Sequence, residues 1–177
     1  VKTECTVTVA VIDNGFLVGH EDLKDNIIAT YNAVTGSTDP ADVAPFTSGN
    51  YVWHGTHVCG IIAASANNGK GIAGVSYNAK LLPIKVFTSS TEATSADIAK
   101  AFDFVLAHAE EYNIKVINFS GGHAINGSDE QDNLVVEKIQ QAYDAGILTV
   151  CAAGNGAQNG PYLSFPGDLS DVALNVI

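Results

Sequence analysis

Apolar residues follow two different patterns along this chain, and together the patterns predict strands alternating with helices. Residues 6–12 (TVTVAVI) form an unbroken, mostly β-branched run, which is typical of a strand buried on both faces. Similar runs predict further strands at residues 81–87, 115–119, 147–153 and 171–177. Pro83 cannot donate to a sheet ladder, so it weakens the case for the run that contains it. Residues 34–52 are rich in Gly, Pro, Ser, Thr and Asp and predict a surface loop.

Helical spacing of apolar residues marks three other segments. A helix beginning at His54 should bury Val58, Ile61 and Ile62. A second, over 95–112, should be capped by Ser95 and bury one face, formed by Ile98, Phe102, Val105, Leu106 and Ala109. The capping-box pattern Ser128-x-x-Gln131 should open a third, which ends at Gly146 and turns inward Leu134, Val135, Ile139, Ala142 and Tyr143.

This alternation predicts an α/β fold, with a parallel sheet covered by helices on both faces. Residues 1–177 contain no repeat, low-complexity tract or internal boundary, so we expect one domain. A hydrophobic content of 46% in 177 residues is enough for a real core. A formal charge of −11 with only 8 Lys+Arg argues against nucleic-acid binding. No apolar run is long enough to span a membrane, and residues 1–20 do not form a signal peptide pattern.

Three cysteines, Cys5, Cys59 and Cys151, cannot all pair within one chain. Cys59 and Cys151 lie in apolar contexts and should be small buried thiols. The valine at position 1, with a strand almost directly after it, suggests a start inside a longer precursor.

The segment His54-Gly55-Thr56-His57-Val58-Cys59-Gly60 contains the strongest candidate chemistry. Glycine lowers helix stability, so Gly55 and Gly60 indicate close approach of another backbone. A histidine that opens a buried helix is held rigidly, as a proton-transfer group must be. Two alternatives stay open at this point: a purely structural histidine, and a metal site that uses His54 with His57, one turn along the helix.

Polar groups also follow two of the predicted strands. Asp13 ends the first strand and Asn155 follows the strand at 147–153, so both belong at the sheet edge where open α/β folds place ligands. Asn14-Gly15 is a turn dipeptide, and Asp13 could simply cap that turn. A carboxylate, an imidazole and an amide donor together match the needs of acyl transfer.

In order along the chain, five motifs resemble those of subtilisin-like serine peptidases (subtilases): Asp13-Asn14-Gly15, His20-x-Asp22-Leu23, His54-Gly55-Thr56-His57-Val58-x-Gly60, Ile117-Asn118-Phe119-Ser120 and Ala152-Ala153-Gly154-Asn155. The resemblance spans nearly the whole chain. It implies a serine endopeptidase that acts on peptide or protein substrates through an acyl-enzyme, and a secreted or cell-envelope location.

Specific roles are implied by the same resemblance. Asp13 would orient the imidazole, His54 would be the general base, and the side-chain amide of Asn155 would donate to the oxyanion. The edge formed by Ser120, Gly121 and Gly122 would pair with an extended peptide, and Ala153 and Gly154 would form part of the pocket for the side chain before the scissile bond. His57 would then be structural.

The chain departs from the family pattern in three places. Gly121 stands where a larger residue is usual, which implies a more open pocket wall, and Gly156-Ala157 replaces the usual pair after Asn155. The chain has no methionine and no Gly-Thr-Ser-Met-Ala-like segment, so the nucleophilic serine is expected beyond Ile177.

Without that segment, we expect the isolated chain to be inactive. We expect it to need a complementing C-terminal segment or an oligomer partner, or to be one part of a larger molecule. The sheet flanks at Val9, Val11, Val116, Ile117 and Val150 should then be less covered than in a two-sided sheet. The alternative is a non-catalytic peptide-binding module that never had a nucleophile.

A structural Ca²⁺ site is implied as well. Its ligands would be the Asp22 carboxylate, the Asn68 side-chain oxygen and the backbone carbonyls of the loop at 66–72, at Ala66, Lys70 and Ile72. The family's further ligand from an N-terminal segment has no counterpart here. A plain polar loop is the alternative.

Overall fold

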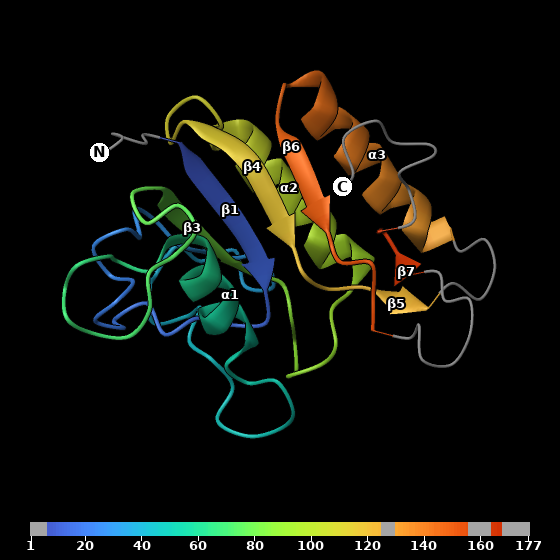
Figure 1. The fold of residues 1–177 in the computed structure, drawn as a ribbon. Coiled ribbons are helices and arrows are strands. Elements are labelled where there is room, and N and C mark those ends of the chain that lie inside the picture. The colour runs from blue at the N-terminus through green and yellow to red at the C-terminus, as the bar shows by residue number, and fades with distance from the viewer. Residues whose placement is uncertain (1–6, 125–129, 156–163, 168–177) are drawn as a thin grey trace.

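Five parallel strands form the central sheet of the computed structural model, which describes residues 7–124, 130–155 and 164–167. The strand order is β2-β3-β1-β4-β6 (Figure 1). The strands are β1 (Thr8–Asp13), β2 (Tyr31–Asn32), β3 (Lys80–Lys85), β4 (Ile114–Phe119) and β6 (Leu148–Cys151). A separate antiparallel pair joins β5 (His123–Ala124) and β7 (Ser164–Phe165).

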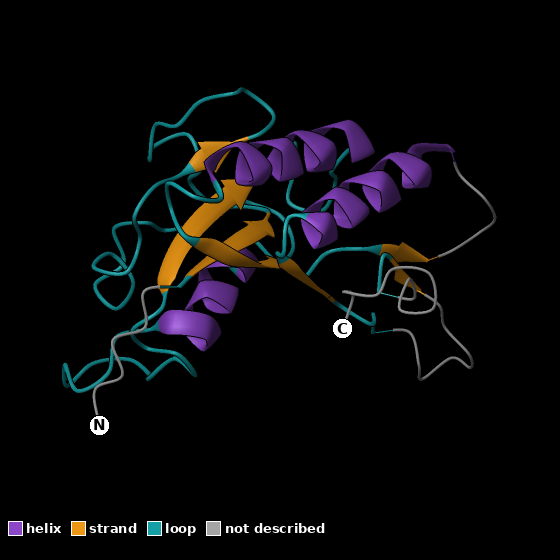
Figure 2. Cartoon of the chain, turned by 90° about the horizontal axis from the view of Figure 1, so that it is seen from above, coloured by secondary structure: helices purple, strands orange, loops and turns teal. Residues whose placement is uncertain are grey.

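Three helices cover the two faces of the sheet, as the predicted α/β fold requires. They are α1 (His54–Ala63), α2 (Ser95–His108) and α3 (Glu130–Asp144). Figure 2 shows α1 alone on one face, with α2 and α3 packed side by side on the other. None of the helices in the described part of the chain is long and apolar enough to cross a membrane.

β1 occupies the centre of the sheet, and all six of its residues are buried. It pairs in parallel with β3 on one side and β4 on the other, so both of its edges are satisfied. Pro83 lies inside β3 after all. Leu81, two residues earlier, donates to Asn26 and accepts from Ile28 on the side away from β1. The backbone nitrogen of Pro83 points to the same side as that of Leu81. On that side β3 has no pairing partner between the isolated Ile27–Leu81 bridge and β2, so no ladder hydrogen bond is lost at Pro83.

α2 and α3 follow the predicted pattern with local corrections. Thr94, not Ser95, caps α2, because the Thr94 hydroxyl accepts from the backbone N–H of Asp97. On α3, Leu134 and Tyr143 were wrongly predicted to face inward. They lie at the rim of the helix face and are 37% and 41% exposed, while the core positions of the same face are Val135, Ile139 and Ala142.

Gly146 ends the α3 segment as predicted. Its φ is +74°, and its N–H donates to the carbonyl of Tyr143. The capping box at Ser128-x-x-Gln131 and the strand at 171–177 lie outside the described residues, so those predictions stay untested. β2 was missed because two residues carry no detectable alternation.

α1 buries a different face from the predicted one. Its buried residues are Gly55, Cys59 and Ala63, all small. Ile61 is 49% exposed, and Val58 and Ile62 are only partly buried. Small side chains let the helix axis approach β1 closely, and this approach rotates the bulkier apolar residues to the flanks.

The predicted exposure of the sheet flanks is partly right. Val116 and Val150 are half-buried, because α1 lies mainly against β1 and β3. Val9, Val11 and Ile117 are buried, contrary to the prediction. The first two pack in the cluster beneath α1, and Ile117 packs in the core that includes α2 and α3.

Candidate active site

Asp13 and His54 form a hydrogen-bonded pair at the carboxyl end of β1. The His54 Nδ1 atom lies 2.9 Å from Asp13 Oδ1 and 2.8 Å from Oδ2. Asp13 is 3% exposed, whereas the His54 side chain is 39% exposed. A carboxylate can only accept, so the Nδ1 atom carries the proton and Nε2 is the free acceptor of the neutral ring. The predicted proximity of these two residues is confirmed.

The carboxylate raises the basicity of the imidazole. The hydrogen bond that His54 donates to Asp13, together with the negative charge of Asp13, raises the pKa of His54 above the ordinary value, against the opposing effect of partial burial. A base held in one tautomer, with its second nitrogen able to accept a proton, is what general-base catalysis requires.

Close backbone packing fixes the distance between the strand and the helix. A Cβ added at Gly55 would lie 2.6 Å from the Gly15 carbonyl oxygen and 3.0 Å from Asp13 Cβ, so only glycine fits. The prediction of close approach is therefore right for Gly55. It is wrong for Gly60, where an added Cβ would only touch Ile72 at an ordinary 3.7 Å.

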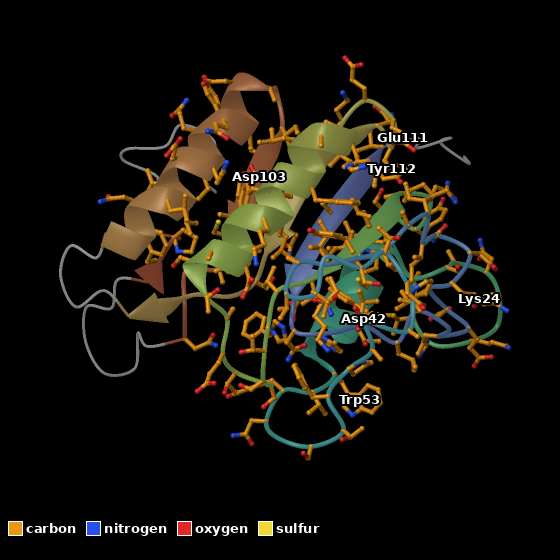
Figure 3. All side chains as sticks on the ribbon, turned by 180° about the vertical axis from the view of Figure 1, so that it is seen from behind. Lys24, Asp42, Trp53, Asp103, Glu111 and Tyr112 are labelled. Carbon is orange, nitrogen blue, oxygen red and sulfur yellow. The ribbon has the colours of Figure 1, made fainter. Side chains whose placement is uncertain are left out.

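The turn before α1 determines that the helix begins at His54. Trp53 occupies the N-cap position without a side-chain hydrogen bond, and its exposed side chain lies at the surface, on the loop that leads into α1 (Figure 3). The backbone N–H of His54 instead donates to the carbonyl of Tyr51 at 2.9 Å. The N-cap residue therefore contributes no side-chain hydrogen bond, and a backbone hydrogen bond to Tyr51 holds the first residue of α1.

An open cleft of about 530 Å³ lies in front of the pair. Predicted site residues from four chain segments meet around it: Asp13, His54, Ser120, Gly121, Gly122, Gly154 and Asn155. Ala153 is not among the lining residues, whereas its neighbour Ala152 is. Asn155 is exposed at this cleft, so its amide is available as a donor. The binding and oxyanion roles of these residues stay predictions.

Gly121 does not leave the void that its small size suggests. A Cβ at this position would lie 2.9 Å from Phe119 Cε2 and 3.6 Å from Phe87 Cζ. The rings of Phe119 and Phe87 therefore occupy the space that a larger residue at 121 would use. Gly156 and Ala157, the other noted departure, lie outside the described residues.

The cleft also contains residues that sequence reasoning missed. Tyr51, Phe87, Ser90 and Thr91 line it, and none carries a signal in a single sequence. Asn14 was interpreted only as a turn residue, yet its side chain is buried and hydrogen-bonded to two distant segments. The sequence signal that points to Asn14 is its position directly after the candidate catalytic Asp13.

His57 is exposed on α1, in contrast to His54. Within the described residues, no group of three or more His, Cys, Asp and Glu side chains is arranged to hold a metal ion. The cysteines do not change this arrangement: Cys59 is buried, Cys151 is partly buried, and both thiols are free. Burial raises the pKa of the Cys151 thiol to about 12, so neither oxidation nor metal binding is favoured there. Cys5 lies outside the described residues.

Asp22 and the loop at 66–72 come together as predicted. Asp22 is buried, and its carboxylate accepts from Asn68 Nδ2 at 2.5 Å and from the backbone N–H of Ile72 at 3.1 Å. These donors, Asn68 first, lower the pKa of the Asp22 carboxyl. Gly71 is required, because a Cβ there would lie 2.1 Å from Asp22 Oδ2.

The loop borders a shallow, open depression of about 340 Å³, lined by residues that include Ala66, Asn68, Lys70 and Ile72. One carboxylate, one side-chain amide and several backbone carbonyls are a donor set that suits Ca²⁺. In the structure the nitrogen of Asn68 faces Asp22, so a cation would need the amide oxygen turned toward it instead.

Comparison with known proteins assigns the chain to a family. Residues 5–177 match the model of the Subtilase family. The "Thermophilic serine proteinase" of Bacillus sp. (strain AK1) is 33% identical over 151 residues, which cover 85% of this chain and 33% of that protein. The "Extracellular protease" of Xanthomonas campestris pv. campestris is 33% identical over 177 residues, covering 85% of this chain and 30% of that protein.

Among solved structures, "S41 Psychrophilic Protease" superposes with a TM-score of 0.78 at 31% identity, covering 98% of this chain and 52% of that one. The chain thus spans about a third of the length of these two curated relatives and about half of that structure.

Proposed function

Because this chain belongs to the subtilase family, we propose that it forms the Asp–His part of a serine endopeptidase that hydrolyses peptide bonds through an acyl-enzyme. One observation carries the proposal: the Asp13–His54 pair, with Nδ1 2.8 Å from the carboxylate, opens onto a cleft of about 530 Å³. A structural histidine would have no need of a cleft on its exposed side.

Each member of the site has a defined task in this reaction. Asp13 holds the ring in the tautomer that leaves Nε2 unprotonated and stabilises the imidazolium when it forms. His54 takes the proton from the serine hydroxyl as that oxygen attacks the carbonyl carbon, and then gives it to the leaving amine. The Asn155 amide donates to the oxyanion, and the peptide lies along Ser120, Gly121 and Gly122.

The serine is proposed to come from outside these 177 residues. No Gly-Thr-Ser segment occurs in the sequence, so the isolated chain should be inactive until that segment is supplied. We also propose secretion of the peptidase, which is supported by the extracellular relative from Xanthomonas.

The test compares the full gene product with three variants on an unstructured protein substrate. In subtilisin itself, loss of the histidine lowers kcat by about 10⁶-fold and loss of the aspartate by about 10⁴-fold, and we expect His54→Ala and Asp13→Asn to show losses of these sizes. His57→Ala is the matched control on the same helix and should keep full activity. Loss of activity in both histidine variants would instead support a metal-dependent hydrolase.

The isolated chain separates the remaining alternatives. By itself it should not hydrolyse any substrate. If the isolated chain does hydrolyse substrate, and His54→Ala abolishes that activity, the serine must lie within these 177 residues and its proposed placement is overturned. Tight binding of unstructured peptide by a full gene product that never cleaves it would support a peptide-binding module.

A structural Ca²⁺ site at Asp22 is proposed separately. The arrangement of Asp22, Asn68 and the loop carbonyls supports it. The ion would have no catalytic role and would only bridge the loop to the segment that carries Asp22. Millimolar Ca²⁺ should raise the melting temperature of the wild-type protein but not of Asp22→Ala. An equal response in both would show that calcium acts elsewhere.

A further inference from the structure

We propose that Asn14 is a positioning residue: its buried amide ties the two rims of the cleft together and thereby holds His54 in register with Asp13. The rims are defined as the His54 rim, residues 49–53, and the Ser90 rim, residues 87–91. The kinetic consequence of this role rests on the proposed peptidase function, whereas its structural consequence does not.

The side chain of Asn14 contacts three residues in two segments that are distant from it in sequence. Its Nδ2 atom donates to the carbonyl of Tyr51 at 2.7 Å and to the carbonyl of Ser90 at 3.3 Å. Its Oδ1 atom accepts from the backbone N–H of Gly55 at 3.4 Å. Asn14 is only 3% exposed, so water cannot easily replace these partners.

One of these partners is shared with the proposed base. The carbonyl of Tyr51 accepts from Asn14 Nδ2 and also from the backbone N–H of His54, at 2.9 Å. Tyr51 has a φ of +60°, a conformation that non-glycine residues adopt only when their surroundings impose it. Its side chain is 72% exposed and supplies no anchor of its own. The amide of Asn14 is therefore well placed to hold this turn.

The Ser90 rim is fixed by the same side chain and by contact with the other rim. A Cβ added at Gly49 would lie 2.3 Å from Ser90 Oγ, so the two rims touch. Tyr51 and Ser90 both line the cleft, and a shift of either would change its width. Asn14 is the first residue after β1, directly next to Asp13, and its side chain contacts both rims.

Only an amide combines the required groups. Asparagine offers two N–H donors and an acceptor on one short planar group, whereas Asp has no donor and Ser has a single one. The chain contains a matched case: Asn26, 7% exposed, donates to the carbonyls of Ala63 at 2.9 Å and Tyr77 at 3.0 Å. Asn26 thus ties the far end of α1 in the same way, away from the cleft.

The experiment compares Asn14→Ala with Asn26→Ala in the full gene product. The two variants should lose similar stability, because each removes two hydrogen bonds from a buried amide to backbone carbonyls. Only Asn14→Ala should lower the pKa of His54, measured by NMR titration of the ring, toward 6.5, the ordinary histidine value. It should also lower kcat roughly tenfold to a hundredfold with a smaller change in KM, because misplacement of the base affects the chemical step.

Several results would overturn this role. The proposal fails if the His54 pKa is unchanged in Asn14→Ala, or if it falls equally in Asn26→Ala. If Asn14→Ala does not fold, Asn14→Ser, which retains one donor, is compared with Asn26→Ser by the same titration. An inactive wild-type gene product would overturn the proposed peptidase function, while the titration would still decide the role of Asn14.

Discussion

The two glycines of α1 should respond in opposite ways to alanine, although a single sequence treats them alike. Replacing glycine by alanine inside a helix favours the helix by about 1 kcal/mol when the space is free. At Gly60 the space is free, since an added Cβ meets only Ile72 Cδ1 at 3.7 Å. Gly60→Ala should therefore raise the free energy of unfolding by about 0.5–1 kcal/mol.

At Gly55 the steric term exceeds the propensity term. The added Cβ would lie 2.6 Å from the Gly15 carbonyl oxygen, 2.9 Å from Phe16 Cε1 and 3.0 Å from Asp13 Cβ, and two of these three neighbours are fixed by the backbone. Overpacking of this kind costs about 1–3 kcal/mol, and the gain in propensity is small in the first turn of a helix. We expect Gly55→Ala to lower the free energy of unfolding by about 1–2 kcal/mol.

Urea denaturation followed by circular dichroism measures both effects, provided that the wild-type and variant proteins unfold with the same m-value. The free energies of unfolding of the two variants should differ by about 1.5–3 kcal/mol, in opposite directions from the wild type. If Gly55→Ala were as stable as Gly60→Ala, the close packing of the helix against β1 would be refuted. A rise in stability of both variants would mean that helix propensity alone decides at these positions.

Three further predictions concern single groups. Thr94→Ala should lower the stability by about 1 kcal/mol in urea denaturation, and Ser95→Ala should change it little, because Thr94 provides the cap. Thr149→Val should keep or raise the stability in the same assay, since the buried Thr149 hydroxyl has no hydrogen-bond partner among the described residues; a loss above about 1 kcal/mol would contradict this. In the pH profile of kcat/KM, the midpoint of the acid limb should lie above pH 6.5, the ordinary histidine value, because the pKa of His54 is raised and the base must be neutral. Asp13→Asn should move this midpoint to lower pH. The stability from this pair should be complete below pH 6.5 and be lost as the pH rises through the folded-state pKa, which thermal melting across pH can follow.

Local patterns in the sequence predicted the α/β class, four of the strands in the sheet and all three helices. Periodicity works for these elements because burial of one face, or of both, is imposed on every residue along them. Because parallel strands deliver their carboxyl ends to a common side, the same patterns predicted that Asp13 and Asn155 lie at one sheet edge. The proximity of Asp13 and His54 was predicted from the resemblance of their motifs to those of the subtilase family.

The tertiary structure decided what depends on the distance between elements. The buried face of α1 is the one with Gly55, Cys59 and Ala63, because close contact with β1 outweighs the hydrophobicity of Ile61. No pattern along the chain could reveal the joint contacts of Asn14 with Tyr51 and Ser90, because its partners are backbone carbonyls, which every residue has. Side-chain type therefore determined which chemistry this chain can offer, and the approach of backbone to backbone determined which residues hold it in place.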